Sequence, residues 1–284
     1  MSILNFVKIN IALKNLIKRA LTGILYVAVV VASIFVHPLL FAGVFSIITG
    51  FLIHELYKMS KYEGAAWQRY VGIFAGIYFF TASCLFAGCY VGSEIYIPYI
   101  IIILVLIISG LYTKQFNPAN QWGILLLGQC YCAGLLSFLC FIPYMTSTGY
   151  DPMPLLLIFI FIWLNDTGAF LVGSVIGKHP LFQRISPRKT WEGFIGGLSF
   201  VVIASLAISC FYTDIPWYHQ IAFAMTTVVF ATWGDLLESL LKRTYGVKDS
   251  GKVLPGHGGV FDRFDSVILV SPAVFILFKL ISVL

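Results

Sequence analysis

The sequence predicts an all-α, polytopic integral membrane protein with about nine transmembrane helices and a cytoplasmic N-terminus. Hydrophobic residues make up 60% of the 284 residues and charged residues only 11%, whereas a soluble domain is nearer half apolar and a quarter charged. The apolar residues gather in runs of about 20, the length that an α-helix needs to cross a bilayer. Basic residues fall almost entirely in every second loop, which is typical of membrane proteins.

The first apolar run, 20–53, is about twice the length of one span and is interrupted at His37-Pro38. Because proline ends a helix, we expect two helices joined by a tight turn there. Residues 1–19 combine basic and apolar residues, which predicts an amphipathic segment on the membrane surface. The run that follows is too long for a cleavable signal peptide. Further spans are expected at 70–88, 95–111, 120–143, 154–173, 194–212, 215–237 and 266–284.

Lysine and arginine separate the loops into two sets. On the N-terminal side lie 17 of the 18 Lys and Arg residues, and the exception is Lys279, in the last helix. The opposite loops contain no Lys or Arg, but they do contain Glu94, Asp151 and Asp214. Since loops rich in Lys and Arg stay in the cytoplasm, we expect the N-terminus in the cytoplasm and the C-terminus outside.

The six cysteines all lie in apolar runs, at positions 84, 89, 130, 132, 140 and 210. None has histidine or aspartate beside it in a metal-binding spacing. We therefore expect them to be buried small hydrophobic side chains.

The stretch from Ser239 to Ser266 holds most of the remaining chemistry. Its cations are Lys242, Arg243, Lys248, Lys252 and Arg263, its aspartates are Asp249, Asp262 and Asp265, and the run Pro-Gly-His-Gly-Gly lies among them. Glycines let backbone N–H groups approach phosphate oxygens, and cations neutralise those oxygens. Carboxylates would repel a phosphate unless a divalent cation lay between them. The composition thus favours a metal–polyphosphate site; the alternative is a solvated loop whose basic charge only fixes topology.

Three acidic residues, Asp166, Asp235 and Glu238, lie within or at the ends of apolar spans. Ionisable groups at membrane depth are costly and usually mark function. Helical spacing places Asp235, Glu238, Ser239 and Lys242 on one face, because they lie at i, i+3, i+4 and i+7. This polar face leads directly into the glycine-rich loop.

A helix beginning near Asp262 would present Asp262 and Asp265 on one side, with Asp262 beside backbone N–H groups that favour phosphate. The carboxylates of Asp235, Asp262 and Asp265 could then converge on one cation. For His257, acid–base chemistry, phosphate binding and a loop-ordering hydrogen bond all remain open. The segment 186–190 suits a second phosphate or a lipid headgroup, or is a basic loop attracted to the membrane surface.

The loop resembles the signature of the phosphatidate cytidylyltransferases, also called CDP-diacylglycerol synthases. The matching elements are Ser239, Lys242-Arg243, Lys248-Asp249, Pro255 to Gly259 and Asp262-Arg263-x-Asp265. Residues 185–193 and 165–170 are also similar to the family, except that Phe170 stands where the family more often has tyrosine. The resemblance covers the C-terminal half, so 154–284 is expected to be the catalytic region. Residues 20–153, the N-terminal transmembrane helices, match only in hydropathy.

The resemblance implies that the protein transfers the cytidylyl group of CTP to phosphatidate, giving CDP-diacylglycerol and pyrophosphate in phospholipid biosynthesis. It implies a multi-pass protein of the cell (inner) membrane with its active site facing the cytoplasm. The implied cofactor is Mg²⁺, held by Asp235 and Asp262, with a second monovalent or divalent cation as an option. The expected partners are CTP, phosphatidate and the lipid bilayer; a homodimer is compatible with the resemblance, and no nucleic acid is expected.

The candidate residues carry different expected roles. The catalytic group is Asp235, Lys242, Arg243, Asp262 and Arg263. The substrate-binding group is Ser186, Arg188 and Lys189 for the phosphatidate headgroup, together with Ser239, Lys248, His257, Gly258 and Gly259. The supporting group is Asp166, Glu238, Asp249 and Asp265, and its aspartates either orient the other groups or hold a second cation.

Two other functions remain open at the level of sequence. A CTP-dependent lipid kinase would use similar residues but transfer the terminal phosphate. An ion-coupled membrane transporter would use Asp166 and Asp235 as an ion path. The transporter alternative does not account for the cations and glycines clustered in one loop.

Overall fold

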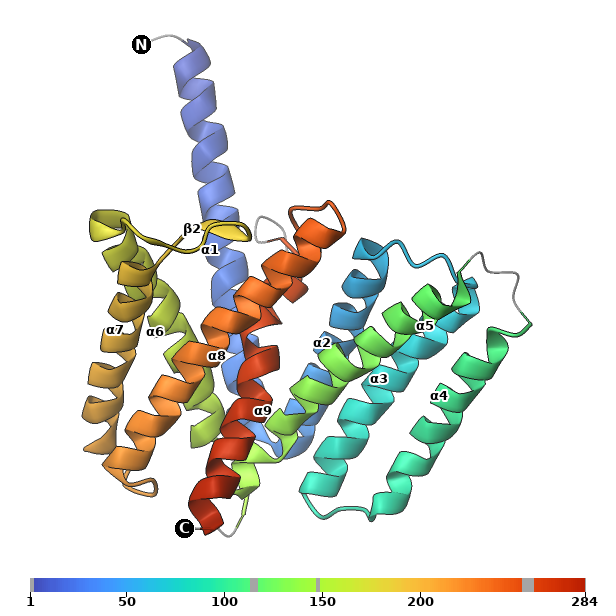
Figure 1. Cartoon of the computed structure of the whole chain (residues 1–284). Coiled ribbons are helices and arrows are strands. Elements are labelled where there is room, and N and C mark those ends of the chain that lie inside the picture. Colours follow the sequence, from blue (N-terminus) through green and yellow to red (C-terminus); the bar gives the residue numbers. More distant parts are fainter. Residues whose placement is uncertain (1–2, 113–116, 147–148, 252–257, 284) are drawn as a thin grey trace.

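The computed structural model describes the backbone of residues 3–112, 117–146, 149–251 and 258–283, and the side chains of these residues except 3–19 and 283. Within this part of the chain, nine α-helices form one bundle (Figure 1). The predicted all-α, polytopic fold is confirmed. The one addition is a small antiparallel hairpin between the sixth and seventh helices.

The helices are α1 (Ile3–Val36), α2 (Pro38–Met59), α3 (Ala66–Ala87), α4 (Ile97–Ser109), α5 (Pro118–Leu127), α6 (Met153–Ile176), α7 (Trp191–Ser209), α8 (Trp217–Thr244) and α9 (Phe261–Val283). A 3₁₀ turn, Ser93–Tyr96, precedes α4, and α5 continues into a π-helical segment, Gly128–Gly134, and two 3₁₀ turns, Ser137–Cys140 and Ile142–Tyr144. Strands β1 (Pro180–Phe182) and β2 (Ser186–Thr190) form the hairpin.

Seven helical segments of the described chain are long and apolar enough to cross a membrane. They are Pro38–Met59, Ala66–Ala87, Pro118–Tyr144, Met153–Ile176, Trp191–Ser209, Trp217–Thr244 and Phe261–Ser282. Two shorter apolar helices, Ala20–Val36 and Ser93–Ser109, occupy the places of the other two predicted spans. The chain is thus a multi-pass membrane protein.

The predicted break at His37-Pro38 is present, because α1 ends at Val36 and Pro38 begins α2. The His37 side chain caps α2, its Nδ1 accepting a hydrogen bond from the Leu39 N–H at 3.1 Å. The basic N-terminal segment differs from the expectation of a separate element. It forms the first part of α1, which extends beyond the bundle in Figure 1. The first 19 residues contain no glycine or proline that would end a helix before the apolar run.

The prediction that all six cysteines are buried is wrong. Cys89, Cys130 and Cys210 are exposed, and only Cys132 is both buried and free. Cys84 and Cys140 are buried but form a disulfide. The apolar runs did not distinguish these cases, because apolar helix faces in a membrane protein also lie against lipid.

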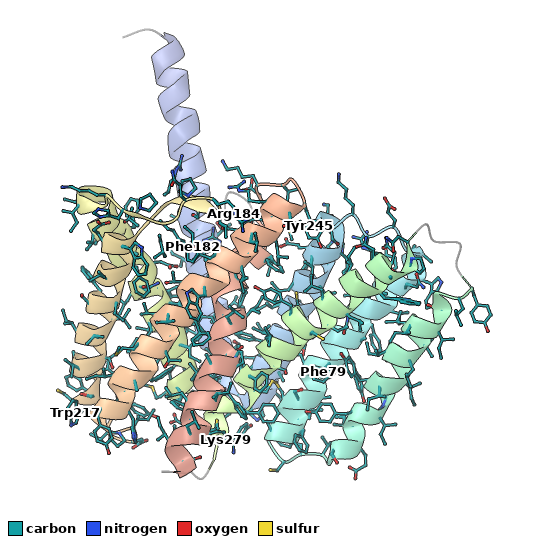
Figure 2. The ribbon with its side chains drawn as sticks, in the orientation of Figure 1. Phe79, Phe182, Arg184, Trp217, Tyr245 and Lys279 are labelled. Atoms are coloured by element: carbon teal, nitrogen blue, oxygen red, sulfur yellow. A yellow bond between two sulfur atoms is a disulfide. The ribbon has the colours of Figure 1, made fainter. Side chains whose placement is uncertain are left out.

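The loops gather at two ends of the bundle. Figure 2 shows Arg184 of the hairpin and Tyr245, just after α8, at one end, and Trp217 and Lys279 at the other. We call the first the hairpin end. Each span from α2 onward reverses direction (Figure 1), so the described parts of the predicted basic loops lie at the hairpin end and those of the loops without Lys or Arg lie at the other.

Candidate active site at the hairpin end

Close packing of α8 against α9 brings together acidic residues from two helices. Gly234 on α8 lies directly against the backbone of Asp265 and Ser266, where a Cβ atom would come 2.5 Å from the Asp265 carbonyl oxygen. The Ser266 hydroxyl donates a hydrogen bond to the Ala231 carbonyl at 3.2 Å. Glycine permits this approach because it has no side chain. The contact fixes Asp265 beside the polar face of α8.

The result is an acidic cluster of Asp235, Glu238 and Asp265. Each contributes a carboxylate oxygen, and these oxygens lie within 4.8 Å of one another. Glu238 is only 2% exposed and Asp265 only 9%. The Oε1 atom of Glu238 is buried and has no hydrogen-bond partner among the described residues. Oxygen ligands at such spacing, one of them unsatisfied, fit a hard cation such as Mg²⁺.

Lys242 connects this cluster to the start of α9. Its Nζ atom lies 2.7 Å from Glu238 Oε2 and 2.9 Å from Asp262 Oδ1. The predicted polar face of α8 is therefore real: Glu238 pairs with Lys242 one turn later, and the Ser239 hydroxyl donates to Asp235 Oδ1 at 3.4 Å. Because all of these groups are at least partly buried, their charges interact more strongly than they would in water.

Asp262 occupies a different position from the one predicted. It lies in the first turn of α9, as expected, but it is not a member of the acidic cluster. Its Oδ2 atom accepts hydrogen bonds from the N–H groups of Gly259 (2.8 Å) and Ser250 (3.4 Å). In this structure Asp262 thus orders the loop and Lys242, while Glu238 joins Asp235 as a potential metal ligand. A metal-binding role for Asp262 stays a prediction.

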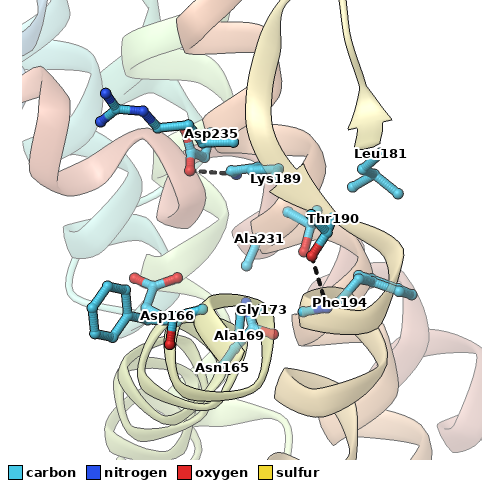
Figure 3. A pocket seen from close by; sticks show the side chains of 15 residues that line it. Asn165, Asp166, Ala169, Gly173, Leu181, Lys189, Thr190, Phe194, Ala231 and Asp235 are labelled. Atoms are coloured by element: carbon cyan, nitrogen blue, oxygen red, sulfur yellow. Dashed lines mark hydrogen bonds and ion pairs between the residues drawn. The ribbon is translucent and has the colours of Figure 1, made fainter. Parts of the chain in front are cut away.

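A cavity of about 390 Å³ opens beside the cluster. It lies between α6, α7, α8 and the hairpin, and Figure 3 shows Asp166, Lys189 and Asp235 around it. Lys189 forms an ion pair with Asp235, so this carboxylate faces both the cavity and the cluster. On α6, Asp166 lines the cavity, and the neighbouring Asn165 has a buried Oδ1 atom with no partner among the described residues.

Contacts at the start of α7 fix the hairpin, and thereby its cations Arg188 and Lys189, beside the cavity. The Thr190 side chain caps α7 by accepting a hydrogen bond from the Gly193 N–H at 3.1 Å, drawn as a dashed line in Figure 3. Glu192 accepts hydrogen bonds from the N–H groups of Lys178 (3.1 Å) and His179 (3.2 Å). Arg188 and Lys189 line the cavity. Ser186 does not, since it pairs with Phe182 at the other end of the hairpin, and its substrate-binding role stays a prediction.

Several of the predicted phosphate-binding cations are exposed to solvent at the hairpin end. Arg188, Arg243 and Lys248 are exposed, and within the described chain no carboxylate forms a salt bridge with any of them. Arg263 is exposed as well, on the first turn of α9, and Asp249 is exposed next to Lys248. Because Arg188, Arg243 and Lys248 have no salt bridge among the described residues, they can bind an anionic ligand without first breaking an ion pair.

The glycines of the loop are required by its geometry. Gly258 has φ = +87°, a conformation that other residues rarely adopt, and a Cβ atom there would lie 2.6 Å from Asp262 Oδ2. A side chain at Gly259 would overlap the Ser250 hydroxyl. Both glycines therefore let the backbone close around Asp262. His257 and Lys252, also predicted for this loop, lie outside the described residues.

Sequence reasoning missed one polar residue of this region, Glu55 on α2. Its carboxylate is only 1% exposed and accepts hydrogen bonds from the loop before α9. The available signal was an acidic residue inside an apolar run, the same signal that identified Asp166. It was overlooked because Glu55 lies near the end of a span, in the half of the chain that lacks the recognised motifs.

The arrangement suits a reaction between two anions. An acidic, metal-compatible cluster pairs with Lys242 through Glu238, and through Asp235 it borders a cavity lined by Arg188 and Lys189. Comparison with known proteins agrees with this chemistry. A sequence profile described as the Cytidylyltransferase family matches residues 17–281, so the chain belongs to that family.

The names of individual relatives specify a reaction as well as a family. The chain is 32% identical over 270 residues to the phosphatidate cytidylyltransferase of Bacillus subtilis strain 168, covering 93% of this chain and 98% of that protein. It is 50% identical over 121 residues to the phosphatidate cytidylyltransferase of Staphylococcus aureus strain COL, covering 42% of this chain and 46% of that protein. The predicted family is thereby confirmed.

Proposed function

We propose that this chain transfers the cytidylyl group of CTP to phosphatidate, forming CDP-diacylglycerol and pyrophosphate. The observation that carries the proposal is the acidic cluster of Asp235, Glu238 and Asp265, which pairs with Lys242 and borders the cavity that Arg188 and Lys189 line. Membership of the cytidylyltransferase family and the names of the relatives support the same reaction.

The chemistry needs charge neutralisation more than a strong base. A phosphate oxygen of phosphatidate, already ionised, attacks the α-phosphorus of CTP; the new O–P bond forms as the bond to the β-phosphate oxygen breaks, and pyrophosphate leaves. Two anionic reactants must be held in line, which is the main requirement of phosphoryl-type transfer. Lys242, Arg243, Lys248 and Arg263 are assigned to the triphosphate and to the leaving pyrophosphate.

Arg188 and Lys189 are assigned to the phosphatidate headgroup, because both line the cavity between α6, α7 and α8. Lys189 also contacts Asp235, so the headgroup site and the acidic cluster share a boundary. Mg²⁺, when bound by Asp235 with Glu238 and Asp265, would neutralise charge between the two reactants. Asp166, exposed to the same cavity, either orients Lys189 or contributes to a second cation. Asp249 is exposed and lies outside the cluster; it either orients the neighbouring cations or contributes to a second cation.

The hairpin end is assigned to the cytoplasm, where CTP is available. The segregation of 17 of the 18 Lys and Arg residues supports this orientation.

The disulfide gives independent support for this orientation. Cys84 and Cys140 lie near the end of α3 and after α5, at the end of the bundle away from the hairpin, and disulfides persist on the oxidising, non-cytoplasmic side of a membrane. The apolar helices and the bacterial relatives support an assignment to the cell membrane. A homodimer, and the lack of a nucleic-acid partner, stay predictions from the sequence.

Purified protein incubated with CTP, phosphatidate and Mg²⁺ tests the proposal through the mass of the lipid product. CDP-diacylglycerol is expected. A lipid carrying one additional phosphate would identify the kinase alternative. Ion uptake by sealed vesicles without nucleotide, together with no lipid product, would favour the transporter.

A further inference from the structure

Glu55 is a buried acid that the proposed mechanism does not use. It lies near the end of α2, is 1% exposed, and belongs to none of the salt bridges among the described residues. A buried carboxylate is costly unless hydrogen bonds compensate for its lost hydration. The hydrogen bonds that the Glu55 carboxylate accepts therefore indicate what the residue does.

The groups that donate hydrogen bonds to Glu55 lie at the two ends of the loop that joins α8 to α9. The Ser250 hydroxyl donates to Glu55 Oε2 at 3.0 Å, and the Phe261 N–H donates to the same oxygen at 2.8 Å. The Val260 N–H donates to Oε1 at 3.1 Å. Two of these donors are backbone groups at the start of α9, where the helix dipole favours a negative charge.

The same loop ends carry the contacts of Asp262. Ser250 uses its hydroxyl for Glu55 and its N–H for Asp262 Oδ2, and Gly259, next to Val260, also donates to that oxygen. Asp262 in turn holds Lys242 at 2.9 Å. Displacing the loop from Glu55 would therefore move Asp262 and then Lys242, two residues assigned to the site.

Two glycines of the loop lie directly against the Glu55 carboxylate. A side chain at Gly251 would overlap the Glu55 carboxylate, and one at Gly259 would overlap both that carboxylate and the Ser250 hydroxyl. Two glycines thus allow both ends of the loop to reach the same buried acid. An acid from the first third of the chain fixes a loop about 200 residues later.

We propose that Glu55 is a positioning residue, which anchors both ends of the loop between α8 and α9 and so sets the places of Asp262 and Lys242 for the triphosphate. It does not touch a substrate. Removing its charge should weaken the use of CTP while leaving the phosphatidate site, on the far side of the acidic cluster, as it is.

The first test is amide hydrogen exchange in the full-length protein without substrate, and it is independent of the proposed reaction. In Glu55→Gln, exchange over 258–264 should accelerate, because the Val260 and Phe261 N–H groups lose their charged acceptor. Asp151→Asn is the matched control. Asp151 is also buried and accepts three hydrogen bonds, from Thr146 (2.9 Å), Met153 (2.9 Å) and Tyr212 (2.5 Å), but it lies at the opposite end of the bundle. It should leave exchange over 258–264 unchanged.

The second test is kinetic, and it rests on the proposed function. Glu55→Gln should lower kcat/KM for CTP about 10- to 100-fold, as expected when bonds to a charged group are lost. The KM for phosphatidate should stay within about twofold of wild type. If Glu55→Gln does not fold, Ser250→Ala removes a single donor and should change the same CTP parameter by about three- to tenfold.

Two results would overturn the proposal. One is unchanged exchange over 258–264 in Glu55→Gln. The other is a loss of apparent kcat with both KM values unchanged, which is the pattern of a smaller folded fraction. If wild-type protein formed no CDP-diacylglycerol, the proposed reaction would fail, and hydrogen exchange would still decide whether Glu55 holds the loop.

Discussion

Neighbouring cations on α8 differ sharply in their surroundings. Lys242 is 15% exposed at its side chain and pairs with two carboxylates, whereas Arg243 is exposed at the hairpin end. The sequence motif makes them equivalent, because it shows only that both are basic. Their burial and partners predict different consequences on removal.

Lys242→Ala should reduce both stability and activity. It leaves Glu238 and Asp262 without their cation, and an unpaired buried charge costs about 3–5 kcal/mol of folding free energy. Arg243→Ala should reduce only activity, by roughly 30- to 1,000-fold if it removes one phosphate contact in the transition state. Thermal unfolding and turnover of CTP, measured on the same preparations, distinguish a loss of stability from a loss of activity alone.

Lys58→Ala is the control for this pair, since Lys58 is exposed near the end of α2 and has no salt bridge among the described residues. It should be nearly silent in both assays. Equal losses of activity at all three positions would show that general basicity, and not a defined site, is being measured.

The carboxylates of the acidic cluster should act as one unit. Asp235→Asn and Asp265→Asn should each abolish most activity, and the double variant should be little worse than either single variant, because both remove the same metal–substrate interaction. Asp214→Asn, at an exposed acid on the opposite end, should retain wild-type turnover. Near-normal turnover of Asp235→Asn at saturating Mg²⁺ would remove Asp235 from the proposed ligand set.

At the scale of helices, local sequence patterns predicted where helices begin and end, but they did not predict which helices contact each other. His37-Pro38 marked the boundary between α1 and α2 because proline terminates helices wherever it occurs. Spacing along α8 correctly placed Glu238 and Lys242 on one face. Spacing cannot show which residue of α9 meets that face, so both Asp262 and Asp265 were predicted to share one cation with Asp235. The close approach at Gly234 brings Asp265, and not Asp262, into the cluster.

Gly234→Ala tests this helix contact. Its new Cβ atom would lie 2.5 Å from the Asp265 carbonyl oxygen, so α9 must move away from α8. We expect a loss of about 1–3 kcal/mol in stability together with a large loss of activity. Gly43→Ala is the matched control in α2, because a Cβ atom there meets nothing within 4 Å. Equal thermal stability of the two variants would contradict the close packing of α8 on α9.

At the scale of the whole molecule, the sequence predicted the membrane fold and the family but not how the two halves cooperate. Motifs predicted 154–284 as the catalytic region, and the residues of the acidic cluster and of the cavity lie within that range. Glu55 belongs to the other half, and no pattern within α2 predicts that it meets Phe261. Such long-range contacts are decided by packing, which neither periodicity nor motif spacing encodes.

Orientation is the second property of the whole molecule that is open to test. After replacement of the native cysteines, Asp214→Cys should react with a membrane-impermeant thiol reagent from outside intact cells, and Lys178→Cys should react only after the membrane is opened. Both positions are exposed, at opposite ends of the bundle. The reverse labelling pattern would place the proposed site on the wrong side for cytoplasmic CTP.

The transfer of labelled phosphorus from CTP to lipid tests the central claim most directly. Purified protein is given phosphatidate and Mg²⁺ with CTP labelled either at the α-phosphorus or at the γ-phosphorus, and the lipid is then extracted and counted. If the acidic cluster and the loop serve cytidylyl transfer, the α-label enters the lipid and the γ-label is recovered in pyrophosphate. Recovery of the γ-label in the lipid, with the α-label left in the soluble nucleotide, would contradict the account.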